Sequence, residues 1–233
     1  MKQICTICAR GGSKGIPGKN LQPFAGRPLL VHTIECAQAY AGFDTIVVST
    51  DDEEVAQIAR KAGASVPFLR PPELATDEAP KLPAIQHAVV AVEEHQQTCV
   101  DLVVDLQPTS PLRLAEDVAG AVATLLASDA ENLVSVCRAR RSPYYDMIVL
   151  DGGRARFVLD PERPFARRQD VPPIYDLNGA IYVWRREALR TARSVIGEAT
   201  IIYEMPPERS IDIDTPLDLA VAEFIKRRTE ASC

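Results

Sequence analysis

Short apolar runs that suit β-strands alternate with segments of helical spacing along most of the chain. A strand pattern at residues 4–9 leads through a glycine-rich loop to a helical pattern at 28–41. A second strand pattern at 45–49 is followed by a helix that spans 51–62. Strands that return through helices form mostly parallel sheets, because the crossover brings the chain back to the same edge. The alternation therefore predicts an α/β fold with a mostly parallel central sheet and helices on both faces.

The later segments continue this order and then interrupt it. Further strands are predicted at 66–69, 102–106, 133–137, 179–184 and 201–204, and further helices at 82–94, 115–126 and 216–227. The run at 102–106 is expected at the centre of the sheet. Residues 138–173 break the rhythm with a hairpin pattern around Gly152 and Gly153, then a basic and proline-rich stretch. We expect one domain over residues 1–233, with 138–173 as an insertion.

Composition and charge exclude several classes of protein. The chain is 46% hydrophobic and 25% charged, which suits a globular protein with a full core. A formal net charge of -6 lacks the basic bias of a nucleic-acid-binding domain. No apolar run approaches the roughly 18 residues of a membrane span, and the N-terminus is too polar for a signal peptide. We expect a cytoplasmic protein in which any anionic ligand meets a local cluster of positive charge.

The six cysteines agree with a reducing compartment. Cys5 and Cys8 form a C-x-x-C pattern, but they lie within a predicted strand, where residues three apart point to opposite faces. Core packing is therefore favoured over a redox role. The three histidines have no spacing typical of a zinc site.

The strongest local signal is A-R-G-G-S-K-G-I-P-G-K-N at 9–20, directly after the first strand. Open α/β folds bind ligands at the carboxyl ends of strands. Glycines let backbone N–H groups approach a ligand, and Arg10, Lys14 and Lys19 supply positive charge. The loop fits neither G-x-x-x-x-G-K-[ST] nor G-x-G-x-x-G. It favours a triphosphate site, and the alternative is a solvated flexible loop.

Two other segments carry polar groups. Asp212 and Asp214 alternate on an extended stretch and so project to one side, which suits a Mg²⁺ site. The alternative is a helix start, with Asp214 or Thr215 as the cap and Pro216 in the first turn. The segment Q-P-T-S-P-L-R at 107–113 follows the central strand and suits a polar ligand or, alternatively, a proline-stiffened turn.

Taken in order, five motifs resemble the CMP-N-acylneuraminate (CMP-sialic acid) synthetase family. They are the loop at 9–20, L-R-P-P-E-L-A-T-D at 69–77, Q-P-T-S-P-L-R at 107–113, N-G-A-I-Y at 178–182 and S-I-D-I-D-T at 210–215. The resemblance covers almost the whole chain. It implies a nucleotide-diphospho-sugar transferase-like fold and a cytidylyltransferase. That enzyme joins CMP from CTP to the anomeric hydroxyl of a nine-carbon keto sugar acid and releases pyrophosphate.

The resemblance also implies residue roles, a cofactor and a partner. The cofactor is Mg²⁺, and the partner is a second copy of the chain, reached by residues 138–173 as a dimerisation element. The implied roles are the following: Arg10, Ser13, Lys14 and Lys19 hold the triphosphate, Asn20 and Arg70 hold the nucleoside and phosphates, Gln107 and Arg168 meet the sugar acid, and Asp212 and Asp214 bind Mg²⁺. Arg10, Lys19 and Asp214 are the implied catalytic residues.

One departure bears on the sugar. Asp176 stands where many sialate-using members carry a basic residue, two positions before Asn178. With Asp176, the stretches at 167–172 and 182–189 and the opening at 5–15 resemble the subgroup that activates legionaminic acid. Tyr144, Tyr145 and Tyr175 are candidate neighbours of the sugar tail. N-acetylneuraminic acid, or another nonulosonic or octulosonic acid, is the alternative.

Two alternatives from other classes are an NAD(P)-dependent reductase and a non-catalytic nucleotide-binding relative. The incomplete glycine fingerprint disfavours the reductase. The second is disfavoured because the loop lysines and both carboxylates are retained.

Overall fold

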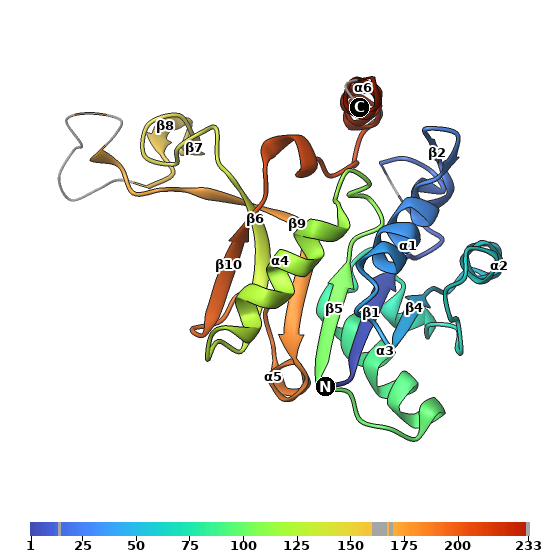
Figure 1. Ribbon diagram of the computed structural model, residues 1–233. Helices are drawn as coiled ribbons and strands as arrows, with labels where there is room; N and C mark the ends of the chain where they lie inside the picture. The colour runs from blue at the N-terminus through green and yellow to red at the C-terminus, as the bar shows by residue number, and fades with distance from the viewer. Residues whose placement is uncertain (14, 160–166, 168–169, 232–233) are drawn as a thin grey trace.

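The computed structural model describes residues 1–13, 15–159, 167 and 170–231, so Lys14, Arg168 and part of the predicted insertion lie outside the described residues. A six-stranded sheet in the order β10-β6-β9-β5-β1-β4 forms its centre (Figure 1). The strands are β1 (Gln3–Cys8), β4 (Thr45–Ser49), β5 (Leu102–Leu106), β6 (Asn132–Arg138), β9 (Tyr175–Arg185) and β10 (Thr200–Glu204). Every residue of β5 is buried, which confirms its predicted central place.

Strand direction confirms a mostly parallel sheet with one exception. β1 is parallel to β4 and β5, and β6 is parallel to β10. β9 lies between β5 and β6 and is antiparallel to both. The chain passes from β6 to β9 through the hairpin segment rather than through a crossover helix, so it returns in the opposite direction.

Helices cover both faces of the sheet, as predicted. They are α1 (Leu29–Tyr40), α2 (Glu53–Lys61), α3 (Lys81–Gln96), α4 (Ala115–Leu126), α5 (Arg186–Thr191) and α6 (Pro216–Glu230). Apolar residues of α1, α2 and α4 form one core cluster with one face of the strands. Those of α3 and α5 form a second cluster with the other face. A third cluster seats α6 against α1 and the loops beside it.

Two local predictions differ from the structure. Residues 66–69 are not a strand, and only Ser65 makes a single bridge to Val47. Pro67 explains the difference, because proline has no N–H to donate to a ladder and restricts the residue before it. Helix α5 was not predicted, because it is short and directly follows β9.

Short elements shape the connections near the carboxyl edge of the sheet. They are the 3-10 turns η1 (Lys19–Leu21), η2 (Pro72–Leu74) and η4 (Pro207–Arg209), and the small ladder of β2 (Pro23–Phe24) with β3 (Arg27–Pro28). The turn η1 lies at the end of the motif at 9–20, and η2 lies within the motif at 69–77.

The predicted hairpin in the insertion is confirmed. β7 (Ile148–Asp151) pairs antiparallel with β8 (Arg154–Phe157), and Gly152 and Gly153 both have positive φ in the turn. The hairpin stands away from the sheet beyond the end of β6 (Figure 1). All eight of its strand residues are exposed.

Candidate active site

Ser13 and Asn20 fold the loop that follows β1. The Ser13 hydroxyl donates to the carbonyl of Ile16 and accepts the backbone N–H of Lys19 at 3.1 Å. The Asn20 amide donates to the Arg10 carbonyl at 2.8 Å, and Asn20 is only 8% exposed. These bonds turn the loop back on itself.

Gly15 brings this loop against the segment that carries the paired carboxylates. A Cβ built at Gly15 would lie 2.4 Å from the carbonyl oxygen of Asp214, closer than a real Cβ contact allows. Glycine is required here by close approach of two backbones. The first and last of the sequence motifs therefore meet, although they lie near opposite ends of the chain.

The loop cations lie beside carboxylates. Arg10 donates to the carbonyl of Thr76 at 2.6 Å and pairs with Oδ1 of Asp77 at 3.0 Å. The ammonium of Lys19 lies 2.7 Å from Oδ1 of Asp214. These pairs hold both cations at the pocket described below, where an anionic ligand can reach them.

Arg70 is fixed at the carboxyl end of β4. Its side chain donates from Nε to the Ser49 hydroxyl at 3.0 Å and from Nη2 to the Ser49 carbonyl. Its own backbone N–H donates to Thr50 at 2.7 Å. Arg70 is 6% exposed, so its charge is presented from a rigid position.

The loop after β5 is joined to the carboxylate segment. Gln107 donates from Nε2 to Oδ2 of Asp212 at 2.7 Å, and the Thr109 hydroxyl donates to Oδ1 at 2.5 Å. The backbone N–H of Ile213 donates to the Thr109 carbonyl at 2.9 Å. Arg113, the last residue of the motif at 107–113, is 3% exposed and donates to the carbonyls of Gln107 and Ala180, so it is not free to contact a ligand.

The helix cap at the start of α6 is Thr215 and not Asp214. The Thr215 hydroxyl accepts the backbone N–H of Asp218, whose carboxylate accepts the Thr215 N–H at 2.7 Å. This frees the Asp214 carboxylate to pair with Lys19. Of the two alternatives for Asp214, the structure therefore does not support side-chain capping.

The donor set of Asp212 and Asp214 suits Mg²⁺. Ile213 between them is fully buried, Asp214 lines the pocket, and Asp212 is held by hydrogen bonds from the loop after β5, so a metal site shared by both carboxylates stays a prediction. Within the described ranges, no group of three His, Cys, Asp or Glu side chains is placed to hold a metal ion. A magnesium ion here would complete its coordination with substrate oxygens and water, as Mg²⁺ commonly does.

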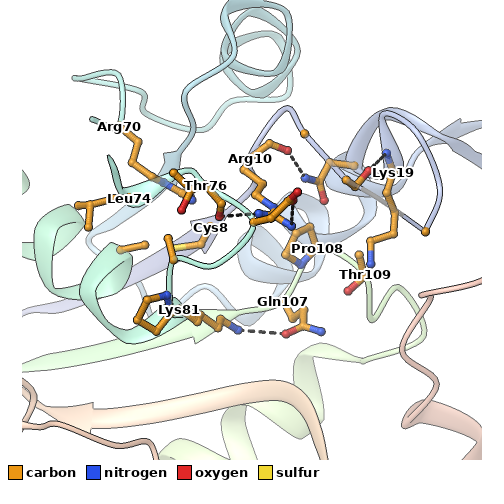
Figure 2. A pocket seen from close by; sticks show the side chains of 18 of the residues that line it. Cys8, Arg10, Lys19, Arg70, Leu74, Thr76, Lys81, Gln107, Pro108 and Thr109 are labelled. Carbon is orange, nitrogen blue, oxygen red and sulfur yellow. Dashed lines mark hydrogen bonds and ion pairs between the residues drawn. The ribbon is translucent and has the colours of Figure 1, made fainter. Parts of the chain in front are cut away.

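These segments surround one pocket of about 440 Å³ at the carboxyl edge of the sheet (Figure 2). Seven of the residues singled out from the sequence line it: Arg10, Ser13, Lys19, Asn20, Arg70, Gln107 and Asp214. Asp212 lies behind Gln107, and Lys14 and Arg168 lie outside the described residues. The described lining carries four cationic side chains and two carboxylates, in a chain of net charge -6. The cations are Arg10, Lys19, Arg70 and Lys81, and the carboxylates are Asp77 and Asp214.

The pocket also contains residues that the motifs did not indicate. Lys81 and Cys8 line it, and the fully buried Asp105 lies next to both. The sequence contained a signal for Asp105, because an acidic residue interrupts the otherwise apolar run of the central strand. Burial raises the pKa of the Cys8 thiol to about 12, and the negative charge of Asp105 adds to this. Cys8 is therefore a neutral thiol and not a nucleophile.

The cysteine pattern packs as expected. Cys5 is fully buried in one core cluster, whereas Cys8 packs against the cluster on the other face. Both are free thiols.

The four residues considered for the sugar tail do not belong to this pocket in the described part of the chain. Tyr144, Tyr145, Tyr175 and Asp176 lie at the base of the insertion, where Tyr145 lines a separate hollow with Arg138.

An open α/β sheet with a cation-lined pocket at its carboxyl edge, built on a glycine-rich loop and paired aspartates, defines a nucleotidyltransferase. Residues 4–226 match the family model described as Cytidylyltransferase, and the chain belongs to that family. No helix in the part of the chain that the structure describes is long and apolar enough to cross a membrane.

Curated relatives extend over most of the chain. It is 37% identical over 222 residues to a CMP-N,N'-diacetyllegionaminic acid synthase of Campylobacter jejuni, covering 95% of this chain and 94% of the relative. It is 36% identical over 217 residues to an N-acylneuraminate cytidylyltransferase of Streptococcus agalactiae, covering 92% of this chain and 51% of the relative. It is 32% identical over 225 residues to a pseudaminic acid cytidylyltransferase of Campylobacter jejuni, covering 97% and 96%.

Solved structures confirm the fold. A CMP:2-keto-3-deoxy-manno-octonic acid synthetase complexed with CTP superposes with a TM-score of 0.71 at 20% identity, covering 98% of this chain and 100% of that one. The nucleotide-diphospho-sugar transferase-like architecture expected from the resemblance is the one observed.

Proposed function

We propose that this cytidylyltransferase joins CMP from CTP to a nonulosonic acid and releases pyrophosphate. The observation that carries the proposal is the convergence of Arg10, Lys19, Gln107 and Asp214 on one pocket, from three separate segments of the chain. The relatives named for legionaminic, neuraminic and pseudaminic acids support this substrate class.

The proposed roles of the pocket residues follow from their charge. Arg10 and Lys19, together with the loop folded by Ser13, hold the triphosphate, and Lys14 is assigned to the same loop by the sequence. Arg70 and Asn20 hold the nucleoside side, and Gln107 presents its amide to the sugar acid. Positioned cations stabilise the charge that develops on phosphoryl oxygens, so no covalent protein nucleophile is needed.

The transfer balances without a redox partner. The anomeric oxygen forms a bond to the α-phosphorus, the bond from that phosphorus to the β-phosphate oxygen breaks, and the hydroxyl proton passes to solvent. Asp212 and Asp214 would hold Mg²⁺, which supplies positive charge at phosphate oxygens and lowers the pKa of a nearby hydroxyl. Lys19 holds Asp214 toward the pocket, and Gln107 and Thr109 hold Asp212.

Within this class we propose legionaminic acid as the preferred sugar. Asp176 in place of a basic residue supports this choice, whereas the identities of 37% to the legionaminic acid synthase and 36% to the neuraminate enzyme support only the shared substrate class. The test is pyrophosphate release from CTP with legionaminic, sialic, pseudaminic and octulosonic acids in turn. No release with any of these acids would contradict the proposal.

We also propose that two copies form the working enzyme. The hairpin exposes a set of large apolar side chains, which a monomer rarely leaves in water: Ile148, Val149, Leu150 and Phe157. We expect a second copy packed there to bring Tyr144, Tyr145 and Asp176 near its partner's pocket, and Arg168 is assigned to the sugar acid by the sequence alone. Sedimentation of the wild type and of Leu150→Asp tests this, and a monomeric wild type would contradict it.

A further inference from the structure

Lys81, in the pocket lining, pairs with a buried carboxylate, and neither residue has a role assigned above. Asp105, in the central strand β5, is fully buried. Its Oδ1 accepts the Thr6 hydroxyl at 2.9 Å, and its Oδ2 lies 2.7 Å from the ammonium of Lys81. A buried carboxylate is costly unless it is paired, so Lys81 and Asp105 depend on one another.

Lys81, the first residue of α3, lines the pocket, and its ammonium contacts several protein groups there. The ammonium has three N–H groups. One side faces Asp105 and another donates to Oε1 of Gln107 at 3.1 Å (Figure 2). A third side faces the ring of Tyr182, whose centroid lies 4.5 Å away, a cation–π contact. Three protein groups therefore contact the ammonium, while the Lys81 side chain stays 27% exposed.

Lys81 remains a charged donor. Burial by itself lowers the pKa of Lys81, but the carboxylate of Asp105, the phenol of Tyr182 and the hydrogen bond to Asp105 outweigh it, and the pKa is raised. The ammonium is therefore present throughout the neutral range.

The donors and acceptors around Gln107 determine which way its amide points. Lys81 has only N–H groups to offer, so it must face the amide oxygen. An ionised Asp212 can only accept, so it must face the amide nitrogen, as the distance of 2.7 Å from Nε2 to Oδ2 shows. Gly179, at positive φ, leaves room for this amide, since a Cβ there would lie 3.0 Å from its oxygen.

We propose that Lys81, anchored by Asp105, is the positioning residue that orients Gln107 for the sugar acid. The contacts form one series across the floor of the pocket, from Asp105 through Lys81 and Gln107 to Asp212. This inference rests on the proposed function, because Gln107 is assigned there to the sugar acid. It adds that recognition of the sugar depends on a charge pair outside the set of residues assigned to either substrate.

The test separates positioning from simple stability. Lys81→Met leaves Asp105 buried without its partner charge and should lower the melting temperature. Adding Asp105→Asn removes that charge and keeps an acceptor for Thr6, so the double variant should recover much of the stability. Its kcat/KM for the sugar acid should nevertheless stay at least about tenfold below wild type, as for partners that orient a binding group. KM for CTP should stay within about twofold.

Two further variants complete the design. Lys81→Arg keeps Asp105 paired but presents a larger planar fork, so it should fold normally and still lose kcat/KM for the sugar acid. Lys226→Met is the matched control, because Lys226 makes an ion pair with Glu230 on α6 and is remote from the pocket lining. It should change neither kinetic constant.

The decisive measurement is the energetic coupling between the Lys81 and Gln107 substitutions. In a Gln107→Ala background the double variant should cause no further loss for the sugar acid, because both changes remove the same contact. Three results would each overturn the positioning role and leave the proposed function standing. The first is that the losses in kcat/KM from Gln107→Ala and from the double variant multiply when the changes are combined. The second is a double variant with wild-type kcat/KM for the sugar acid, and the third is a rise in KM for CTP as large as the loss for the sugar acid. A wild type that releases no pyrophosphate with any sugar acid would overturn both.

Discussion

The ammonium of Lys19 lies 2.7 Å from Oδ1 of Asp214, although 195 positions separate the two residues in the chain. The pair joins the glycine-rich loop to the carboxylate segment. It places a cation and a candidate metal ligand at the same side of one pocket. Each partner can be tested separately, because one is assigned to phosphate and the other to Mg²⁺.

Asp214→Asn tests the metal assignment. Asn keeps the shape of the side chain but removes its charge, so turnover should fall by about 10²-fold or more, as when one strong electrostatic contact is lost. The melting temperature should change little, because Thr215 rather than Asp214 caps α6. Turnover is followed by pyrophosphate release in Mg²⁺. Near-normal turnover of the Asn variant would contradict the metal role.

Lys19→Ala tests the phosphate assignment. Loss of the ammonium should weaken stabilisation of the transferring phosphoryl group and lower kcat/KM for CTP by at least about tenfold. Lys61→Ala is the control, since Lys61 is exposed in the last turn of α2. Similar effects at both positions would show that general charge, and not a site, was measured.

Gly15→Ala tests the contact between the loop and Asp214. The added Cβ would lie 2.4 Å from a backbone oxygen, so the two segments must separate. We expect the melting temperature to fall by a few degrees, since about 1 kcal/mol corresponds to roughly 2–4 °C in a chain of this size. Gly12→Ala, whose Cβ would meet nothing within 4 Å, should leave the melting temperature unchanged. Equal melting temperatures for the two variants would refute the close approach.

Glu93 gives a prediction about acid stability. Arg186 holds Glu93 by two hydrogen bonds, of 3.1 and 2.7 Å, and lowers the pKa of Glu93, although burial partly opposes it. A lowered pKa means that this stabilisation is present above the unfolded-state pKa and is lost as pH falls through the folded-state pKa. Glu93→Gln should therefore cost about 1–3 kcal/mol near neutral pH and less in acid. Denaturant unfolding of both proteins at several pH values measures the difference, and a constant difference would contradict the assignment.

The sugar preference is the last prediction. A pocket that accommodates the methyl end of legionaminic acid discriminates against a hydroxyl only modestly, by about 10²-fold at best. We expect a higher kcat/KM for di-N-acetyllegionaminic acid than for N-acetylneuraminic acid, with activity remaining on the second. The two are compared at saturating CTP. The reverse order would reject the subgroup and leave the cytidylyltransferase unaffected.

Local pattern was sufficient for most of the elements and for the family. The alternation of strands and helices predicted the layered sheet, because each element's periodicity is set by which face it buries. Position 67 shows the limit of that reasoning. The apolar run at 66–69 has strand composition, but Pro67 prevents regular pairing, and only Val66 of the run is buried while Leu69 is exposed.

By itself the sequence determined the fold class, the loop at 9–20 and the paired aspartates, since each is a local pattern with its own physical signature. Only the tertiary structure decided that β9 runs antiparallel, because an apolar strand pattern carries no direction. Likewise only the structure assigned the helix cap to Thr215 and joined Asp105, Lys81 and Gln107. Those contacts link residues far apart in the chain, and hydrogen bonds and charge pairs between them exist only once the sheet and α3 have brought them within bonding distance.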